Sequence, residues 1–490
     1  MKKSLLLILF IILFVEIPMA QNLTAQIEKA EFLLKHHQEQ TNTPGVQVAV
    51  LIDGKLVWSE AYGYADIEQP AALQTQTPMR VASVSKPMTS MVLGKLVEDG
   101  IIDLDEDIRT YVPEYPDKGA TIKARHLAAS TSGIRHYSAD DPEYNQVHYP
   151  SVIDALAPFK NDTLLFNPGT EYHYSSYGWV LLSAAMERAS GIAFQNLMQS
   201  HWSYLGMRNT HFDHPVFHPE KISSQYILKN PGFLRRLFSK NDSERQTAPK
   251  EDRSYMYAGG GYLSTAEDLV NMGWKLISGK TLKDSTLQIL FQGQALENGA
   301  STHYGLGWDV GMSRTGTPVV FHSGSMSSAR SHLVIYPEKK LVFAFIMNTG
   351  DHVFFNDREA QTIAELFLNK EKSINKASSI TGQWDITTTS LRDKRTNGEL
   401  TLSVDSTQTI KGTISFKHSR KKKTFPIILT GMDNNEYHFV GVSPMYFDLY
   451  ATFDKDSFSG RWLHDFNVKG NPEIDSYWKP RAIEGERDSF

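Results

Sequence analysis

Residues 81–89 read Val81-Ala82-Ser83-Val84-Ser85-Lys86-Pro87-Met88-Thr89, and an apolar, helix-favouring stretch follows as far as Gly100. This pattern predicts that Ser83 lies on the first turn of a helix and Lys86 one turn further on. Side chains three residues apart on a helix share a face, at about 5–6 Å between Cβ atoms, so the amine reaches the hydroxyl. Burial and the positive end of the helix dipole both favour a neutral lysine. The pair therefore predicts a serine nucleophile with its own amine base.

The Ser-x-x-Lys spacing alone is weak, because it occurs four times, at Ser83, Ser373, Ser419 and Ser476. The last three stand in polar or charged surroundings, whereas Ser83 precedes a strong helix. An N-capping serine beside a solvated lysine is the alternative reading of the Ser83 motif. The choice between the two readings depends on the rest of the chain.

The amino-acid composition excludes several kinds of catalytic site and binding partner. The 490 residues are enough for two or three domains, and they include no cysteine,. A thiol nucleophile, disulfides and a cysteine-ligated zinc are therefore excluded. The formal net charge of −5 is not that of a nucleic-acid-binding protein,. The basic run 420–423 is flanked by strand-like segments, which favours a solvated hairpin loop over a polyanion contact.

The N-terminus has the plan of a secretory signal peptide over residues 1–20. Lys2 and Lys3 precede an apolar run from Leu5 to Val15, and the small residue Ala20 ends the segment,. The run is shorter than the ~20 residues that span a bilayer. We therefore expect export to the periplasm or secretion, with no stable membrane span after cleavage; an uncleaved anchor is the alternative.

The pattern of strands and helices expected over residues 21–372 predicts an α+β domain. Residues 45–52 and 55–61 flank the turn pair Asp53-Gly54 and indicate a β-hairpin,. Helical patterns dominate from about 84 to 290, where Ser264 and Glu267 have capping-box spacing, and strands return between 304 and 347. We expect an antiparallel sheet in which the N-terminal and C-terminal strands meet, flanked by helices.

The pattern changes beyond residue 372. Short alternating runs separated by turn residues predict that residues 373–490 form an all-β module, a small barrel or a sandwich. Residues 229–253 are charged and weakly patterned, which favours a long surface insertion. A helix is expected over 23–39.

Three further segments carry polar residues at the ends of predicted elements. Residues 168–178 include Tyr174 and lead into a helix, residues 255–265 contain the Gly259-Gly260-Gly261 run, and residues 321–325 read Phe-His-Ser-Gly-Ser. Taken alone, each has a structural explanation: an aromatic at a helix entrance, a tight bend and a polar strand end.

Taken together with Ser83 and Lys86, these segments resemble the serine β-lactamase and penicillin-binding superfamily, specifically its class C branch. That branch includes D-alanyl-D-alanine carboxypeptidases, esterases and the mitochondrial β-lactamase-like protease. The resemblance covers about residues 25–370, with supporting stretches at 125–127, 131–133 and 304–308. It implies a β-lactamase-like fold and acyl transfer without a cofactor.

The resemblance also implies a role for each motif residue. Ser83 corresponds to the acylated nucleophile, Lys86 to its proton partner, and Tyr174 to the family's Tyr-x-Asn tyrosine, a general base or acid whose pKa a nearby Lys86 is expected to lower. His322 corresponds to the Lys/His-x-Gly motif, and the backbone N–H groups of Ser83 and Ser325 to the oxyanion hole. The substrate-binding positions are Ser176 and Gly324.

Two departures from the family pattern bear on the substrate. Ser176 stands where the motif has an asparagine that helps to hold the substrate amide, and His322 replaces the lysine of true class C β-lactamases. An imidazole attracts a substrate carboxylate less than a fixed ammonium does. These departures favour an esterase or peptidase over an efficient β-lactamase.

We therefore expect an exported serine hydrolase that acts on an ester, amide or peptide carbonyl of a small-molecule or peptide substrate. The alternatives are a D-alanyl-D-alanine carboxypeptidase or β-lactamase proper, a penicillin-binding sensor with little turnover, and a protein whose C-terminal module binds a glycan or a partner. No metal is expected. The crowded His211, Asp213, His214 and His218 form the one rival site, and His-rich loops are usually solvated.

Overall fold

The structure is a computed structural model. It describes residues 23–138, 141, 146–214, 222–229, 244–313, 316–350, 357–368, 377–389, 395–418, 421–433, 435–443, 445–464 and 481–487. The chain divides into two compact units, one made of residues 42–361 and the other of residues 1–41 together with 362–490. Each unit is described separately below. The predicted signal peptide and most of the predicted 229–253 insertion lie outside the described residues.

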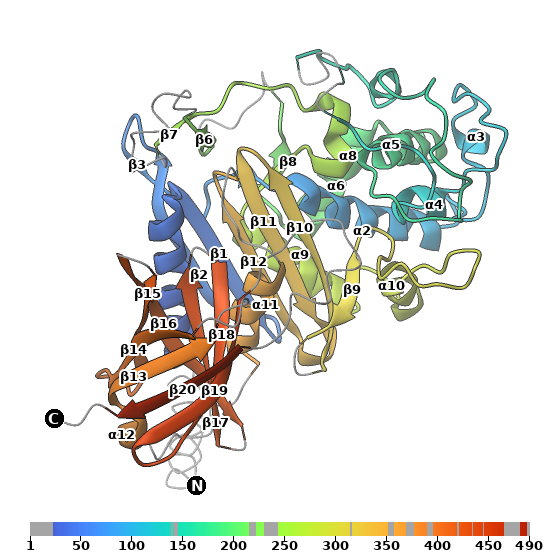
Figure 1. The fold of residues 1–490 in the computed structure, drawn as a ribbon. Coiled ribbons are helices and arrows are strands. Elements are labelled where there is room, and N and C mark those ends of the chain that lie inside the picture. Colours follow the sequence, from blue (N-terminus) through green and yellow to red (C-terminus); the bar gives the residue numbers. More distant parts are fainter. Residues whose placement is uncertain are drawn as a thin grey trace, which may run out of the picture. The chain divides into compact units, whose positions relative to one another are not determined.

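The 42–361 unit is built on a seven-stranded antiparallel sheet with the order β3-β2-β1-β12-β11-β10-β9 (Figure 1). Its strands are β1 (Gly45–Ile52), β2 (Lys55–Asp66), β3 (Ala71–Ala72), β9 (Asp309–Met312), β10 (Pro318–Met326), β11 (Ala329–Tyr336) and β12 (Leu341–Met347). The N-terminal and C-terminal strands meet where β1 pairs with β12, with Val48 opposite Phe345. The α+β prediction is therefore confirmed.

The hairpin between β1 and β2 turns at the predicted pair. Asp53 and Gly54 both have positive φ angles, +47° and +80°, as a tight two-residue hairpin turn requires,. Helix α9 (Ala266–Ile277) packs on β1 and β12. A Cβ atom on Gly273 would lie 2.7 Å from Val342, so this glycine lets α9 approach the sheet closely,.

The predicted cap of α9 is displaced by one residue. Thr265, rather than Ser264, is the N-cap, and its side chain accepts a hydrogen bond from the Asp268 backbone N–H at 3.2 Å. Glu267 instead accepts a hydrogen bond from Ser59 Oγ at 2.6 Å. The N-cap is the residue with extended backbone directly before the first helical residue. Thr265 holds that position, because Ser264 is still paired in β8 (Tyr262–Ser264).

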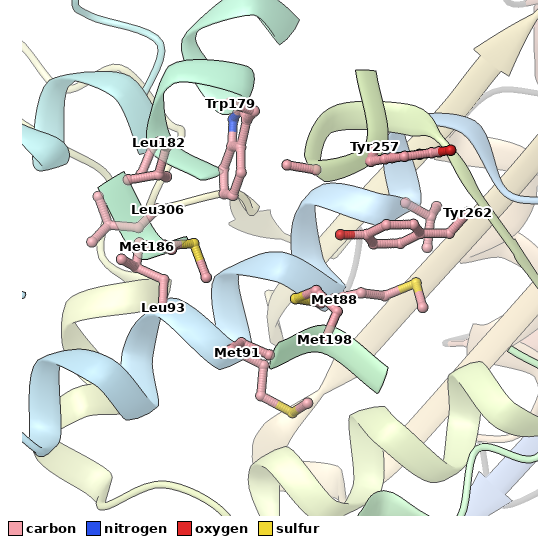
Figure 2. Packing of buried hydrophobic residues seen from close by; sticks show 14 of the residues in the cluster. Met88, Met91, Leu93, Trp179, Leu182, Met186, Met198, Tyr257, Tyr262 and Leu306 are labelled. Carbon is pink, nitrogen blue, oxygen red and sulfur yellow. The ribbon is translucent and has the colours of Figure 1, made fainter. Parts of the chain in front are cut away.

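A helical layer surrounds α2 (Ser85–Glu98), which is buried on nearly every side. A helix that is apolar all round belongs to a core rather than to a surface. Figure 2 shows the core that α2 shares with α5 (Ser176–Ser190), α6 (Phe194–Leu205) and α8 (Tyr257–Gly260), in which Met88 and Met91 lie near Met198.

The other elements of this unit are β4 (Met79–Arg80), η1 (Ala82–Val84), α3 (Ile108–Tyr111), α4 (Ala124–Ala128), η2 (Asp154–Leu156), β5 (His211–Phe212), β6 (Tyr226–Leu228), β7 (Arg245–Thr247), η3 (Ser254–Met256), α10 (Asp284–Phe291) and η4 (Pro337–Lys339). Helix α11 (Asp357–Leu366) contains residues on both sides of the boundary between the units in the sequence.

The second unit contains a closed antiparallel barrel with the order β13 to β20. Its elements are α12 (Ala377–Ile380), β13 (Gly382–Thr389), β14 (Arg395–Val404), β15 (Ile410–His418), β16 (Lys421–Asp433), β17 (Glu436–Ser443), β18 (Met445–Phe453), β19 (Ser457–His464) and β20 (Arg481–Arg487). Its core is a cluster of large apolar side chains that includes Trp384, Phe439 and Phe458. The all-β prediction is confirmed in its barrel form rather than as a sandwich.

The basic run 420–423 is not simply the predicted loop. Lys421, Lys422 and Lys423 pair with β15 as the first residues of β16, so most of the run is strand. Lys422 Nζ lies 2.6 Å from a carboxylate oxygen of Glu399 on β14. Within this run, Lys422 therefore has a carboxylate partner on the neighbouring part of the barrel.

The second unit also contains the N-terminal helix, which spans residues 23–41. Gln40 Nε2 donates to the Val442 carbonyl at 2.9 Å, and the rings of His37 and Tyr446 lie 6.0 Å apart. The units therefore divide at 41/42 and 361/362, whereas the sequence placed this helix with the α+β domain and the boundary at 372/373. Because the contact between Gln40 and Val442 joins residues some 400 positions apart, no local sequence pattern indicates that this helix belongs with the barrel. Among the described helices, none is both long and apolar enough to cross a membrane.

Candidate active site

Ser83 lies on a strained turn at the start of α2. It is the middle residue of the 3₁₀ turn η1, and Ala82 before it has a φ of +45°, which is unfavourable for a residue with a Cβ atom,. Ser85 Oγ donates to the Ala82 carbonyl at 2.7 Å and holds this turn against the helix. Ser83 is half-buried, whereas its neighbours Ala82 and Val84 are in the core.

Strand β10 lies directly against this turn because residue 324 is a glycine. A Cβ atom on Gly324 would lie 2.2 Å from both the Val81 carbonyl oxygen and Ser331 Oγ. Ser331 Oγ also donates to the Val81 carbonyl at 2.5 Å. Gly324 is therefore a buried position whose lack of a side chain lets β10 approach the turn, and its predicted contact with a substrate stays a prediction. The next residue, Ser325, is exposed at the end of β10.

Lys86 is completely buried and has three polar partners. Its Nζ lies 2.6 Å from the Gly259 carbonyl oxygen, 2.9 Å from Ser176 Oγ and 3.2 Å from Ser83 Oγ. A neutral amine has two N–H groups and one lone pair. Donation to Gly259 and Ser176 leaves that lone pair for the Ser83 hydroxyl.

Burial lowers the pKa of Lys86 well below its usual value,. No carboxylate among the described residues forms an ion pair with it, which agrees with a neutral amine. The triple-glycine run acts here through its backbone: Gly259 supplies the carbonyl, and a Cβ atom on it would lie 3.3 Å from Ser176. The sequence identified this run but not that contact.

Tyr174 lies over Lys86, whose Nζ is 4.7 Å from the centre of the tyrosine ring. Its loop is held by Ser130: the His173 N–H donates to the Ser130 carbonyl at 2.9 Å and the Ser175 N–H to Ser130 Oγ at 3.3 Å. Ser175 then caps α5 by accepting from the Gly178 N–H at 3.0 Å.

The expectation that Lys86 lowers the pKa of Tyr174 is wrong. Burial raises the pKa of Tyr174 well above its usual value, and the hydrogen bond to Ser83 offsets this only in part. A neutral Lys86 carries no charge that would stabilise a tyrosinate. The hydrogen bond with Ser83 favours the ionised phenol, as a bond donated by the Ser83 hydroxyl does, but burial has the larger effect on the pKa of Tyr174,.

Ser176, which was predicted to bind the substrate, is fully buried, and that role stays a prediction. Its hydroxyl serves Lys86, and its backbone N–H donates to His136 Nδ1 at 3.0 Å. Reasoning from the sequence missed His136, which is 40 residues away in the chain. Its position just after the Thr131-Ser132-Gly133 stretch carried no signal of this contact.

His322 is a buried, neutral imidazole with both nitrogens engaged. Nδ1 donates to the Ser323 carbonyl at 2.7 Å, so Nε2 accepts from the Tyr304 hydroxyl at 2.9 Å,. Burial lowers the pKa of His322 to about 3. Only 3% of the residue is exposed. His322 lies beside Tyr174, with ring centres 6.2 Å apart, but it offers no free N–H group.

A structural contact explains part of the histidine-rich segment 211–218, the rival candidate for a functional site. Arg80 Nε lies 2.6 Å from a carboxylate oxygen of buried Asp213, so this carboxylate is already paired. Burial lowers the pKa of His211. His218 lies outside the described residues. Across the described ranges, no three His, Asp or Glu side chains gather in a way that could hold a metal ion.

The fold and this arrangement define the chain as a β-lactamase-like protein of the serine hydrolase superfamily. A family profile described as Beta-lactamase matches residues 31–367. The chain therefore belongs to the β-lactamase family.

Its relatives agree with this assignment. The mouse serine β-lactamase-like protein LACTB, mitochondrial, is 30% identical over 337 residues, which cover 54% of this chain and 59% of that protein. The chain thus spans about three fifths of the relative's length. The octameric penicillin-binding protein homologue from Pyrococcus abyssi shares the fold with a TM-score of 0.60 at 19% identity, over 93% of this chain and 99% of that one. The D-amino acid amidase from Ochrobactrum anthropi also has a TM-score of 0.60, at 21% identity, over 70% and 99% of the two chains.

Proposed function

We propose that the protein is a hydrolase that forms an acyl-enzyme on Ser83 from an ester, amide or peptide carbonyl. The observation that carries this proposal is the set of three partners around Lys86, which leaves the amine lone pair for the Ser83 hydroxyl. A buried lysine of lowered pKa beside a serine is a pair that can generate an alkoxide near neutral pH.

In the acylation step, Lys86 Nζ takes the Ser83 proton while Ser83 Oγ bonds to the substrate carbonyl carbon. The backbone N–H groups of Ser83 and Ser325 would donate hydrogen bonds to the developing oxyanion, a stabilisation that is usually the largest single contribution to acyl transfer. The proton then passes to the leaving oxygen or nitrogen as its bond to carbon breaks. Tyr174, which keeps its own proton and contacts Ser83, is positioned to relay it.

In the deacylation step, a water molecule takes the place of the leaving group. Lys86, neutral again, accepts a proton from this water as the water oxygen bonds to the acyl carbon. Collapse of the oxyanion breaks the ester bond and returns the proton to Ser83 Oγ. The same amine thus acts as base in both steps, and no cofactor is needed in this scheme.

The charges near the nucleophile favour uncharged substrates. Lys86 and His322 are both buried and of lowered pKa, so neither offers a cation to a substrate carboxylate. We therefore infer that esters and amides without a carboxylate beside the scissile bond are better substrates than penicillins or peptides ending in a free carboxylate. Amidase and esterase structures among the fold neighbours are compatible with this preference.

The test is the intact mass of the protein over time with an activated ester and with a penicillin, for the wild type and Ser83→Ala. Transient acylation by the ester, absent in Ser83→Ala, would support the proposal. Stable penicillin adducts without turnover would favour the sensor reading instead. No adduct and no turnover with either compound would contradict the proposal.

We also propose export, on the signal-peptide pattern of residues 1–20 alone. The N-terminal residue of the protein recovered from the host's periplasm or medium tests it. A chain starting after residue 20 is expected, and an uncleaved chain in the cytoplasm would contradict it.

A further inference from the structure

The 42–361 unit has a cavity that is not part of the candidate active site. Its volume is about 640 Å³, and its lining residues come from three segments, 119–131, 167–170 and 294–297. Neither Ser83 nor Tyr174 lines it. Small-molecule sites in proteins usually have volumes of about 300–1,000 Å³. The cavity is therefore large enough to hold a ligand of its own.

A chain of backbone hydrogen bonds holds the three segments together. The Thr131 N–H donates to the His126 carbonyl at 2.9 Å, the Gly169 N–H to the Thr131 carbonyl at 2.8 Å, and the Glu297 N–H to the Gly169 carbonyl at 3.0 Å. Each segment is thus fixed to the next before any ligand binds. A site that is already ordered loses less conformational entropy on binding.

Gly169 leaves a hollow between two polar side chains of this cavity. Its φ of +88° is in the left-handed region, and a Cβ atom built on it would lie 3.5 Å from His126 Nε2 and 3.7 Å from Glu297 Oε1. These are ordinary van der Waals distances. A ligand atom at the same point would therefore touch both side chains.

The two side chains offer one hydrogen-bond donor and one acceptor. His126 Nδ1 accepts from the Lys123 N–H at 3.3 Å, so the neutral ring carries its hydrogen on Nε2,. Burial lowers the pKa of His126 to about 4, so the ring is neutral at physiological pH. The Glu297 carboxylate, on an exposed residue, only accepts,. Among the described residues, neither His126 Nε2 nor this carboxylate has a hydrogen-bond partner.

The charges around the cavity favour an uncharged ligand. Its two cations share one carboxylate, because Arg125 Nη2 lies 2.8 Å and Lys123 Nζ 3.5 Å from oxygens of Asp105. The Glu297 carboxylate would repel an anion, and the His126 N–H group cannot accept from a cation. A ligand that uses both side chains is therefore neutral, with a donor beside an acceptor.

We propose that this cavity binds a neutral saccharide, in which one hydroxyl accepts from His126 Nε2–H and its neighbour donates to the Glu297 carboxylate. A hydroxyl both donates and accepts, so a pair of adjacent hydroxyls matches this pair of side chains. Asn167 and Thr170 add amide and hydroxyl groups to the lining. A sugar ring carries hydroxyls on several sides and can meet them, whereas a single peptide amide offers one donor and one acceptor. The site does not depend on the chemistry of Ser83.

The experiment titrates the full chain with glucose, galactose, mannose and N-acetylglucosamine, with saturation-transfer NMR to detect binding and calorimetry to measure the Kd. We expect at least one of these sugars to bind with a Kd of about 1 mM or tighter. Methylammonium and phosphate are the cationic and anionic comparison probes. Binding of either ion without binding of a sugar would overturn the inference, and so would a failure of every probe to bind.

The variants locate the bound sugar. Gly169→Ala places a methyl group in the hollow and should raise the Kd about tenfold or more, while Glu297→Ala, at an exposed residue, should raise it about tenfold through loss of a hydrogen bond. Gly279→Ala is the matched control, because Gly279 has a φ of +69° and nothing lies within 4 Å of its Cβ position. It has comparable backbone strain and should leave the Kd unchanged.

His126→Asn gives an independent check of the donor. The Asn oxygen takes the place of Nδ1 and keeps the contact with the Lys123 N–H, but the Nε2–H group is lost, so the Kd should rise about tenfold. Thermal melts show that each variant is folded. Unchanged binding in Gly169→Ala and Glu297→Ala would place the sugar elsewhere and overturn the inference. Loss of binding in Ser83→Ala would place it in the candidate active site, with the same consequence.

Discussion

Gly324→Ala is the substitution with the most sharply defined effect in this structure. The new methyl group would lie 2.2 Å from the Val81 carbonyl oxygen and from Ser331 Oγ, about 0.8 Å closer than the 3.0 Å that a Cβ atom needs. The first neighbour is backbone and cannot rotate away. The turn that carries it already includes the strained Ala82, so β10 is the part that must move.

A shift of about 1 Å between β10 and η1 separates the two proposed oxyanion donors, which lie on these two elements. Loss of one such donor costs roughly 100-fold to 1,000-fold in kcat, and a displacement of 1 Å in an active site costs about 100-fold. We therefore expect a fall in kcat/KM of about 100-fold. Overpacking of this kind also lowers the free energy of unfolding by about 1–3 kcal/mol.

The assay is the hydrolysis of an activated ester, with thermal unfolding measured in parallel. Gly311→Ala is the control in the same sheet, because a Cβ atom there meets only Phe321, at 3.9 Å. This control should keep kcat/KM within about twofold and unfold normally. Wild-type activity in Gly324→Ala would refute the argument that Gly324 sets the distance between β10 and the nucleophile turn.

Three further predictions follow from the site and the barrel. Lys86→Met should lower kcat by about 100-fold to 10,000-fold, because it removes the proton acceptor; stopped-flow acylation at an unchanged rate would contradict this. The acidic limb of kcat/KM against pH should lie well below 10.5, because burial lowers the pKa of Lys86. Between that lowered pKa and 10.5, the unfolded chain binds a proton at Lys86 that the folded chain does not, so the free energy of unfolding rises with pH,. Lys86→Met should flatten this rise in denaturant titrations. In the barrel, Trp384→Ala should cost about 3–5 kcal/mol, since the side chain is fully buried against Phe453 and Phe458,; calorimetry that shows no shift of the barrel transition would refute it.

Local patterns predicted much of the fold. The Asp53-Gly54 turn, the buried helix after Ser83 and the alternating strands beyond residue 380 each follow from residues close in sequence, and each is present. The proximity of Ser83 and Lys86 was predictable for the same reason, since they are three residues apart, although Ser83 lies in η1 just before α2 rather than on the first turn of that helix.

The remaining features depend on contacts between distant segments. The contact of Ser176 with Lys86 was not predicted from the sequence, because the two residues are 90 positions apart. His136 was missed for the same reason. Whether the pKa of Tyr174 is raised or lowered depends on the charge of Lys86. The charge of Lys86 depends in turn on its burial in a core assembled from four helices.

The helix over residues 23–41 has a consequence for the order in which the protein can be made. Its Gln40 contact lies 402 residues further along the chain, in the barrel. At about 5–20 residues per second, the ribosome needs roughly 20–80 s to synthesise that partner. The unit over 42–361 is complete well before then. The helix, with the buried Ala30, Leu33 and Leu34, therefore precedes this contact by the time needed to synthesise the whole 42–361 unit. Until Val442 has been synthesised, the Gln40 side chain lacks the carbonyl to which it donates.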